Sequence, residues 1–185
     1  MVELACTPGQ TVGPFFHLAL PYSGDSRLVS DAHAGAIRLH GTVSDGARDA
    51  VPDALVELWQ TGPDGRMVRR EGSLRRDGET FTGWGRCATD AAGRYSFSTL
   101  TPGAPAAGRA AFFAITVFAR GLLNRVFTRA YLPDAGLDAD RLLSALDAAR
   151  RQTLICTAET GGYRFDIHLQ GANETVFLAY PGIPG

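Results

Sequence analysis

The histidines of this chain have the right chemistry for binding a metal, but they lack the spacing. They are His17, His33, His40 and His168. None of them belongs to an HxH, HxxxH or HExxH pattern, the spacings that place two imidazoles on one face of a strand or helix. We therefore interpret all four as solvated or hydrogen-bonded side chains.

The cysteines are equally poor candidates for chemistry. Cys6, Cys87 and Cys156 are odd in number and far apart, so they match neither a disulfide framework nor a CxxC metal or redox pair. Free thiols in a reducing cytoplasm fit this pattern best. The chain has no GxSxG elbow and no cysteine close to a histidine, so a nucleophilic triad is unsupported. The sequence thus predicts neither a catalytic residue nor a metal ligand in this chain.

Composition narrows the classes of protein that remain. A length of 185 residues with 45% hydrophobic residues suits one domain with a single substantial core. Eighteen basic and nineteen acidic residues leave a formal charge of -1, so nucleic acid is not an expected partner. The N-terminus lacks a signal-peptide pattern, and no apolar run approaches the roughly 18 residues of a membrane span. The sequence predicts a cytoplasmic protein without a membrane partner.

The sequence predicts that the secondary structure supporting any functional site is mostly β. Residues 1–30 are rich in proline and glycine without periodicity, which predicts an extended arm, and residues 31–185 are expected to form one sandwich core. A turn at Asp90–Gly93 is interpreted as part of a hairpin. Alternating or short apolar runs predict strands at 37–43, 54–59, 94–100, 112–118, 125–132, 163–169 and 175–180.

One short helix is expected, at about 137–150. Leu142, Leu146 and Ala149 recur there at helical spacing, and Asp138 and Asp140 lie near the favoured N-terminal end. The fold class predicted from these elements is a mainly β, single-domain β-sandwich with an extended N-terminal arm and one short helix.

Two further groups of side chains could bind a ligand or a partner, but neither indicates a specific function. Trp59 and Trp84 could stack on a ligand, but their strand-like surroundings favour core packing. Four arginines in the long polar segment between 60 and 84 could dock an acidic surface, although such a run is usually solvated. They are Arg69, Arg70, Arg75 and Arg76.

Five stretches, in order, resemble the intradiol dioxygenase family. They are TPGQTVGPFF (7–16), VELWQTGPDGR (56–66), GWGRCATDAAGRYSFSTLTPG (83–103), FARG (118–121) and YRFDIHLQG (163–171). One strand-turn-strand motif would be a weak signal, but five in register over nearly the whole chain are strong. The resemblance implies the family's β-sandwich fold.

The resemblance also implies that an iron site has been lost. Catalytic chains of the family hold Fe(III) on two tyrosines and an HxH pair, since phenolate donors stabilise ferric iron. In this chain Met67 replaces the first tyrosine, and Phe112 and Ala114 stand at the histidine positions. The second tyrosine is expected near Ala104 and Pro105, in a loop that is shorter here. No four-ligand iron site is expected.

The family resemblance therefore implies an α-type subunit without metal. Its homologous β subunit would hold the Fe(III) cofactor and cleave protocatechuate with O2 to 3-carboxy-cis,cis-muconate, and the α chain would line part of the pocket in αβ pairs. The substrate-facing α positions are then Thr11, Gly13, Pro14, Phe15 and Arg120. A stiff backbone against the ring and a cation near the carboxylate would suit this substrate.

Plainer interpretations of these residues stay open. Gly13 and Pro14 on their own describe an ordinary turn, and Arg120 on its own describes a surface arginine at a strand end. The whole chain could also be a stand-alone module that binds small aromatic compounds, or a purely structural assembly subunit. A neighbouring gene with an intact Tyr, Tyr and HxH set would favour the subunit interpretation.

Overall fold

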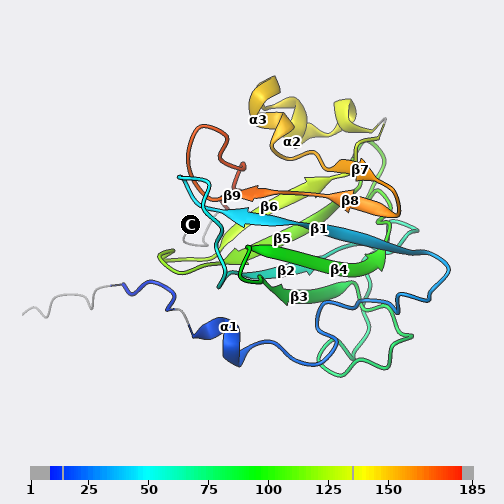
Figure 1. Ribbon diagram of the computed structural model, residues 1–185. Helices are drawn as coiled ribbons and strands as arrows, with labels where there is room; N and C mark the ends of the chain where they lie inside the picture. The colour runs from blue at the N-terminus through cyan, green and yellow to red at the C-terminus, as the bar shows by residue number, and fades with distance from the viewer. Residues whose placement is uncertain (1–8, 14, 135, 181–185) are drawn as a thin grey trace, which may run out of the picture.

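Two facing β-sheets enclose the main core of the molecule, which confirms the prediction of a mainly β fold (Figure 1). The computed structural model describes residues 9–13, 15–134 and 136–180. The first sheet has the order β4-β1-β8-β7, and β9 also pairs with β1. Its strands are β1 (Ala36–Ser44), β4 (Arg94–Leu100), β7 (Thr157–Glu159), β8 (Gly162–Arg164) and β9 (Ile167–His168).

The second sheet is antiparallel and has the order β3-β2-β5-β6. Its strands are β2 (Leu55–Trp59), β3 (Trp84–Ala88), β5 (Phe112–Phe118) and β6 (Val126–Tyr131). The turn at 90–93 connects β3 to β4, which belong to different sheets. The predicted hairpin is therefore wrong, because this turn carries the chain from one layer to the other.

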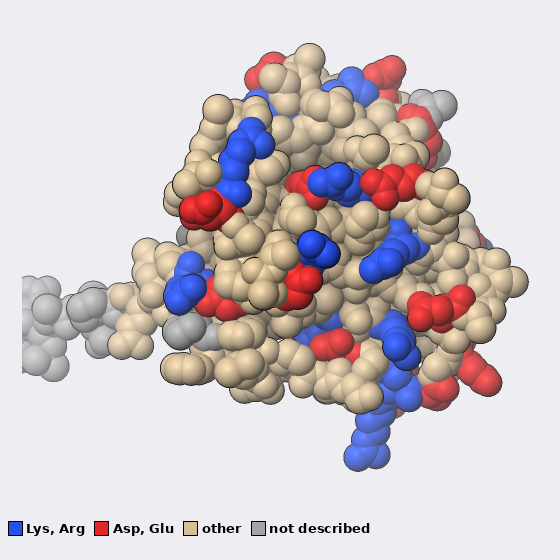
Figure 2. All heavy atoms as spheres, viewed as in Figure 1, with Lys and Arg blue, Asp and Glu red and all other residues tan. Residues whose placement is uncertain are grey.

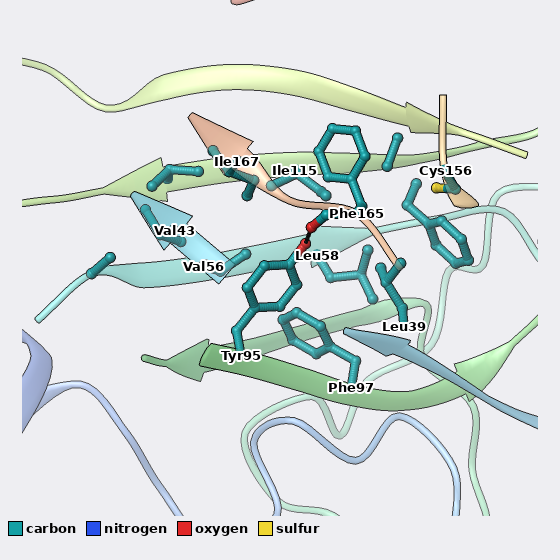
Figure 3. Packing of buried hydrophobic residues seen from close by; sticks show 14 of the residues in the cluster. Leu39, Val43, Val56, Leu58, Tyr95, Phe97, Ile115, Cys156, Phe165 and Ile167 are labelled. Atoms are coloured by element: carbon teal, nitrogen blue, oxygen red, sulfur yellow. Dashed lines mark hydrogen bonds between the residues drawn. The ribbon is translucent and has the colours of Figure 1, made fainter. Parts of the chain in front are cut away.

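The core lies between the sheets and follows from the two-residue period of the strands. Along β5, Phe113, Ile115 and Val117 are fully or almost fully buried, and the residues between them face the other side of the sheet. In the opposite sheet, the Tyr95 hydroxyl of β4 reaches over Gly41 of β1 and donates a hydrogen bond of 2.5 Å to the Phe165 carbonyl (Figure 3). This bond satisfies a polar group that would otherwise be costly to bury.

The helical region differs from the single helix expected at 137–150. It consists of a 3-10 turn, Leu137–Ala139, and two short helices, α2 (Arg141–Ser144) and α3 (Ala148–Gln152). Asp140 and Asp147 have extended backbones and accept hydrogen bonds from amides inside the helix that follows. Each is thus an N-cap that starts a new helix, which breaks the apparent periodicity.

The C-terminal strands also depart from expectation. The predicted strand at 163–169 is divided into β8 and β9, because the Asp166 side chain accepts hydrogen bonds from the Thr42 amide and hydroxyl. No strand forms at 175–180. There the Thr175 amide bonds to His168 of one sheet and the Leu178 amide to Phe127 of the other, so this segment crosses between the sheets.

The N-terminal arm is only partly extended. It contains the one-turn helix α1 (Phe16–Ala19), and its second half packs on the first sheet, where Leu28 and Val29 are buried. The amides of both residues lie within hydrogen-bonding distance of the Ser98 carbonyl. Within the described residues, no helix is long and apolar enough to cross a bilayer.

Charges of both signs are mixed over the face of the first sheet (Figure 2). Some of them form ion pairs, such as Arg164 with Asp166 at 2.8 Å, and Glu159 forms a hydrogen bond of 2.8 Å with His40. The face shown in Figure 2 therefore has no continuous basic patch of the kind that holds a phosphate backbone.

Candidate functional site

A pocket of about 240 Å³ opens on the outer face of the second sheet. Phe112 and Ala114 reach it because they alternate with the core residues of β5 and so point away from the core. Met67 and Pro105 come from two loops that meet in front of the sheet, where the Gly65 and Gly103 backbones touch so closely that neither has room for a Cβ atom.

This pocket brings together the positions that the family resemblance assigns to iron ligands. Met67, Pro105, Phe112 and Ala114 all line it, although they are distant in the sequence. A thioether and three hydrocarbon side chains offer no phenolate, imidazole or carboxylate for ferric iron. In the described part of the chain, no group of three or more His, Cys, Asp or Glu residues could hold a metal ion. The residues present do not fit an iron site.

The histidines and cysteines are the other residues that could act as ligands or nucleophiles. His33, His40 and His168 take part in hydrogen bonds, as expected, with the Gly35 amide, Glu159 and Ser44. His17 departs from the expectation, because its Nδ1 is buried without a hydrogen-bond partner among the described residues. Burial raises the pKa of the Cys156 thiol to about 12 and also raises that of Cys87. Both thiols are therefore protonated and unreactive at neutral pH. Cys6 lies outside the described residues.

A second site forms where the arm meets the loop after β5. The Val12 amide donates a hydrogen bond of 3.0 Å to the Leu122 carbonyl, so residues 11–13 lie beside the turn that carries Arg120. Arg120 forms an ion pair with Asp53, with Nε 3.1 Å from Oδ2. Both residues line a pocket of about 290 Å³. The structure thus brings together two motifs that the sequence separates widely.

Four of the residues predicted to face a substrate are described, and they lie on the surface around this corner. Thr11, Gly13 and Phe15 are exposed, and Phe15 is 75% exposed. Pro14, the remaining predicted residue of the arm, lies outside the described residues. The Arg120 side chain is 58% exposed despite its ion pair. Thr11, Gly13, Phe15 and Arg120 therefore lie outside the core of their own chain.

Sequence reasoning missed two residues of these sites and misjudged a third. Nothing in the sequence links Asp53 to Arg120 or places Arg129 beside Phe112, because both contacts depend on the register of paired strands. Trp84 is buried as expected, but Trp59 is 45% exposed and lines the first pocket, so its assignment to the core was wrong. Its position as the last residue of β2 was the available signal.

Comparisons with known proteins agree with this geometry. A family model described as "Dioxygenase" matches residues 12–171. The chain is 37% identical to the protocatechuate 3,4-dioxygenase alpha chain of Burkholderia cepacia, over 96% of this chain and 99% of that one. The chain belongs to the intradiol dioxygenase family. The sequence-based resemblance to this family is confirmed.

Other intradiol dioxygenase relatives extend the comparison. The chain is 36% identical to the protocatechuate 3,4-dioxygenase beta chain of Burkholderia cepacia, over 73% of this chain and 64% of that one. Among solved structures, the dioxygenase domain of a carbohydrate-binding fusion protein from Streptomyces sp. SirexAA-E matches with a TM-score of 0.59 and 26% identity. That match covers 90% of this chain and 99% of the domain.

Iron analysis of the purified full chain provides a direct test of the lost site. We expect no stoichiometric iron and no visible tyrosinate-to-iron charge-transfer band, because Met67, Phe112 and Ala114 supply none of the usual donors. Elemental analysis and absorption spectroscopy after incubation with ferric iron would measure this. The Met67→Tyr variant should behave in the same way, since a single phenolate cannot complete the site. Tight, coloured iron binding by the unmodified chain would contradict the assignment.

Proposed function

We propose that this chain is the metal-free α chain of a protocatechuate 3,4-dioxygenase. The observation that carries the proposal is the pocket in which four former ligand positions meet but hold Met67, Pro105, Phe112 and Ala114. The identity to an alpha chain over nearly the full length of both proteins supports the same conclusion. A homologous β chain then holds the Fe(III), and the αβ pair opens the protocatechuate ring with O2 to give 3-carboxy-cis,cis-muconate.

The arm and the corner beside it are the proposed contribution of this chain to the shared pocket. We infer that Thr11, Gly13, Pro14 and Phe15 form a wall against the substrate and that Arg120 attracts its carboxylate. A Cβ atom on Gly13 would meet nothing within 4 Å among the described residues, so a close-fitting partner or substrate is the proposed reason for glycine there. An exposed guanidinium suits a planar carboxylate because it can donate two parallel hydrogen bonds.

Asp53 is proposed to hold Arg120 in place for this role. The carboxylate is 6% exposed, and its Oδ2 pairs with the Arg120 Nε. The other oxygen, Oδ1, is buried without a hydrogen-bond partner among the described residues. Asp53 is largely enclosed by protein, so its ion pair with Arg120 holds both side chains in place. Asp53 is a positioning residue rather than a substrate contact.

We also propose that the chain forms one domain and works in the cytoplasm. The described thiols, Cys87 and Cys156, are free, as suits a reducing compartment. The larger hydrophobic cluster contains Ala130 and the smaller one contains Tyr131. These residues are neighbours in β6, so the two clusters adjoin, which supports a single domain.

Co-expression with a candidate β chain tests the proposed function. We expect a stable αβ complex with protocatechuate-cleaving activity and iron that copurifies with β. The α chain alone should form mixed oligomers, because Phe15, Leu18 and Leu20 are exposed along the arm and need a covering surface. Sedimentation velocity and oxygen consumption would measure both results. A clean α monomer, together with a β chain that is fully active alone, would instead support a stand-alone binding module.

A further inference from the structure

The pairing of three strands determines the shape of the pocket at the lost iron site. Trp59 pairs with Ala114 across β2 and β5, and Ala114 pairs with Arg129 across β5 and β6. Residues directly opposite each other on neighbouring strands share a face of the sheet. A large, a small and a large side chain therefore stand in one row, which leaves a notch at Ala114. All three residues line the pocket.

One end of this row carries a cation that has no counter-ion among the described residues. The Arg129 guanidinium carbon lies 4.2 Å from the centroid of the Phe112 ring, and Nη1 donates a hydrogen bond of 3.1 Å to the Tyr131 hydroxyl. The ion pairs found among the described residues do not include Arg129. A half-buried cation with neutral neighbours attracts an anion more strongly than a solvated one.

The polar side chains of Gln60 and Thr61, which also line the pocket, are already occupied by hydrogen bonds. The Gln60 amide nitrogen donates to the Leu100 carbonyl at 2.8 Å, and its oxygen accepts from the Thr99 hydroxyl at 2.5 Å. The Thr61 hydroxyl donates to the Gly103 carbonyl at 2.7 Å. The pocket therefore combines largely apolar walls with one cation, which is the pattern of a site for a small apolar anion.

We propose that this pocket binds a small planar aromatic carboxylate, with its ring beside Trp59 and its carboxylate on Arg129. A cavity of about 150 Å³ is enough for benzene, so about 240 Å³ accommodates a substituted ring. The site is non-catalytic, because it lacks metal donors. It goes beyond the proposed function and does not depend on it, since every residue involved belongs to this chain.

Calorimetric titration of the full chain with benzoate and with benzamide tests the proposal. The two probes have nearly the same shape, but only benzoate is charged. We expect saturable binding of one benzoate per chain, and binding of benzamide at least about tenfold weaker, because the charge-assisted contact is lost. Arg129→Gln should weaken benzoate by a similar factor. Ala114→Leu should prevent binding of both probes by filling the notch.

Arg125→Gln is the matched control, because Arg125 also stacks on a phenylalanine ring, that of Phe127, at 5.1 Å. It should leave benzoate affinity unchanged. The absence of saturable binding would overturn the proposal, and so would equal affinity for the two probes or equal losses in the two arginine variants. The comparison of probes uses the unmodified chain, so it decides the question even if a variant fails to fold.

Discussion

Replacing Arg120 with alanine is expected to lower kcat/KM for protocatechuate roughly 5- to 150-fold in the αβ enzyme. This corresponds to a loss of about 1 to 3 kcal/mol of transition-state stabilisation. The physical reason is the loss of a charge-assisted contact to the substrate carboxylate. Catechol lacks that carboxylate and should lose much less. The iron content should stay unchanged, because Arg120 lies on a different chain from the proposed metal. Steady-state kinetics with both substrates, together with iron analysis, would measure these effects.

Two controls separate a direct contact from general electrostatics. Arg125→Ala removes the same charge from the same loop, at an exposed residue, and should cost little. Asp53→Asn keeps the Arg120 charge but loosens its anchor, so it should cost less than Arg120→Ala while preserving the contrast between the substrates. A long-range steering effect would shrink at high salt. Equal losses for protocatechuate and catechol would mean that Arg120 supports the interface or the fold instead.

Replacing Gly41 with alanine is expected to destabilise the fold by about 3 kcal/mol. Gly41 lies in β1, and a Cβ atom there would be 1.9 Å from the Phe165 carbonyl oxygen, which must then move. That oxygen accepts the Tyr95 hydrogen bond, and the Phe165 amide bonds to the His40 carbonyl at 2.8 Å, so the backbone is held on both sides. Urea unfolding followed by circular dichroism would measure the loss.

Gly35→Ala is the matched control for this change. Gly35 lies just before β1, and an added Cβ there would make only ordinary contacts, the nearest at 3.6 Å to His33. It should change the free energy of unfolding by less than about 1 kcal/mol. If both variants lost the same stability, the close approach of Gly41 to Phe165 would not explain the need for glycine at position 41.

Local periodicity was enough to find most strands but not the register in which they pair. The strands at 37–43 and 112–118 were predictable because one face of each enters the core, and burial imposes a two-residue alternation. The expected helix was broken because Asp140 and Asp147 can cap a helix as well as begin its acidic first turn. Composition alone cannot distinguish these two roles.

Some residues of the candidate sites could likewise be predicted from the sequence, and others could not. Phe112 and Ala114 could be recognised as former ligand positions because a family motif carries the alignment. Arg129 could not, because it reaches the pocket through its pairing with Ala114 on another strand. Asp53 was missed for a similar reason, since its ion pair with Arg120 joins loops of distant sequence position. Contacts set by register become visible only once the strands are assembled.

The alternation along β5 has a consequence for how such subunits diverge. Phe113, Ile115 and Val117 build the core, and the former ligand positions Phe112 and Ala114 lie on the opposite face of the same strand. After gene duplication, one copy can therefore exchange its metal donors for hydrocarbon side chains without disturbing the larger core between the two sheets. Selection on chemistry and selection on stability act on alternate residues, so a catalytic ancestor can give rise to a specialised companion in a few substitutions.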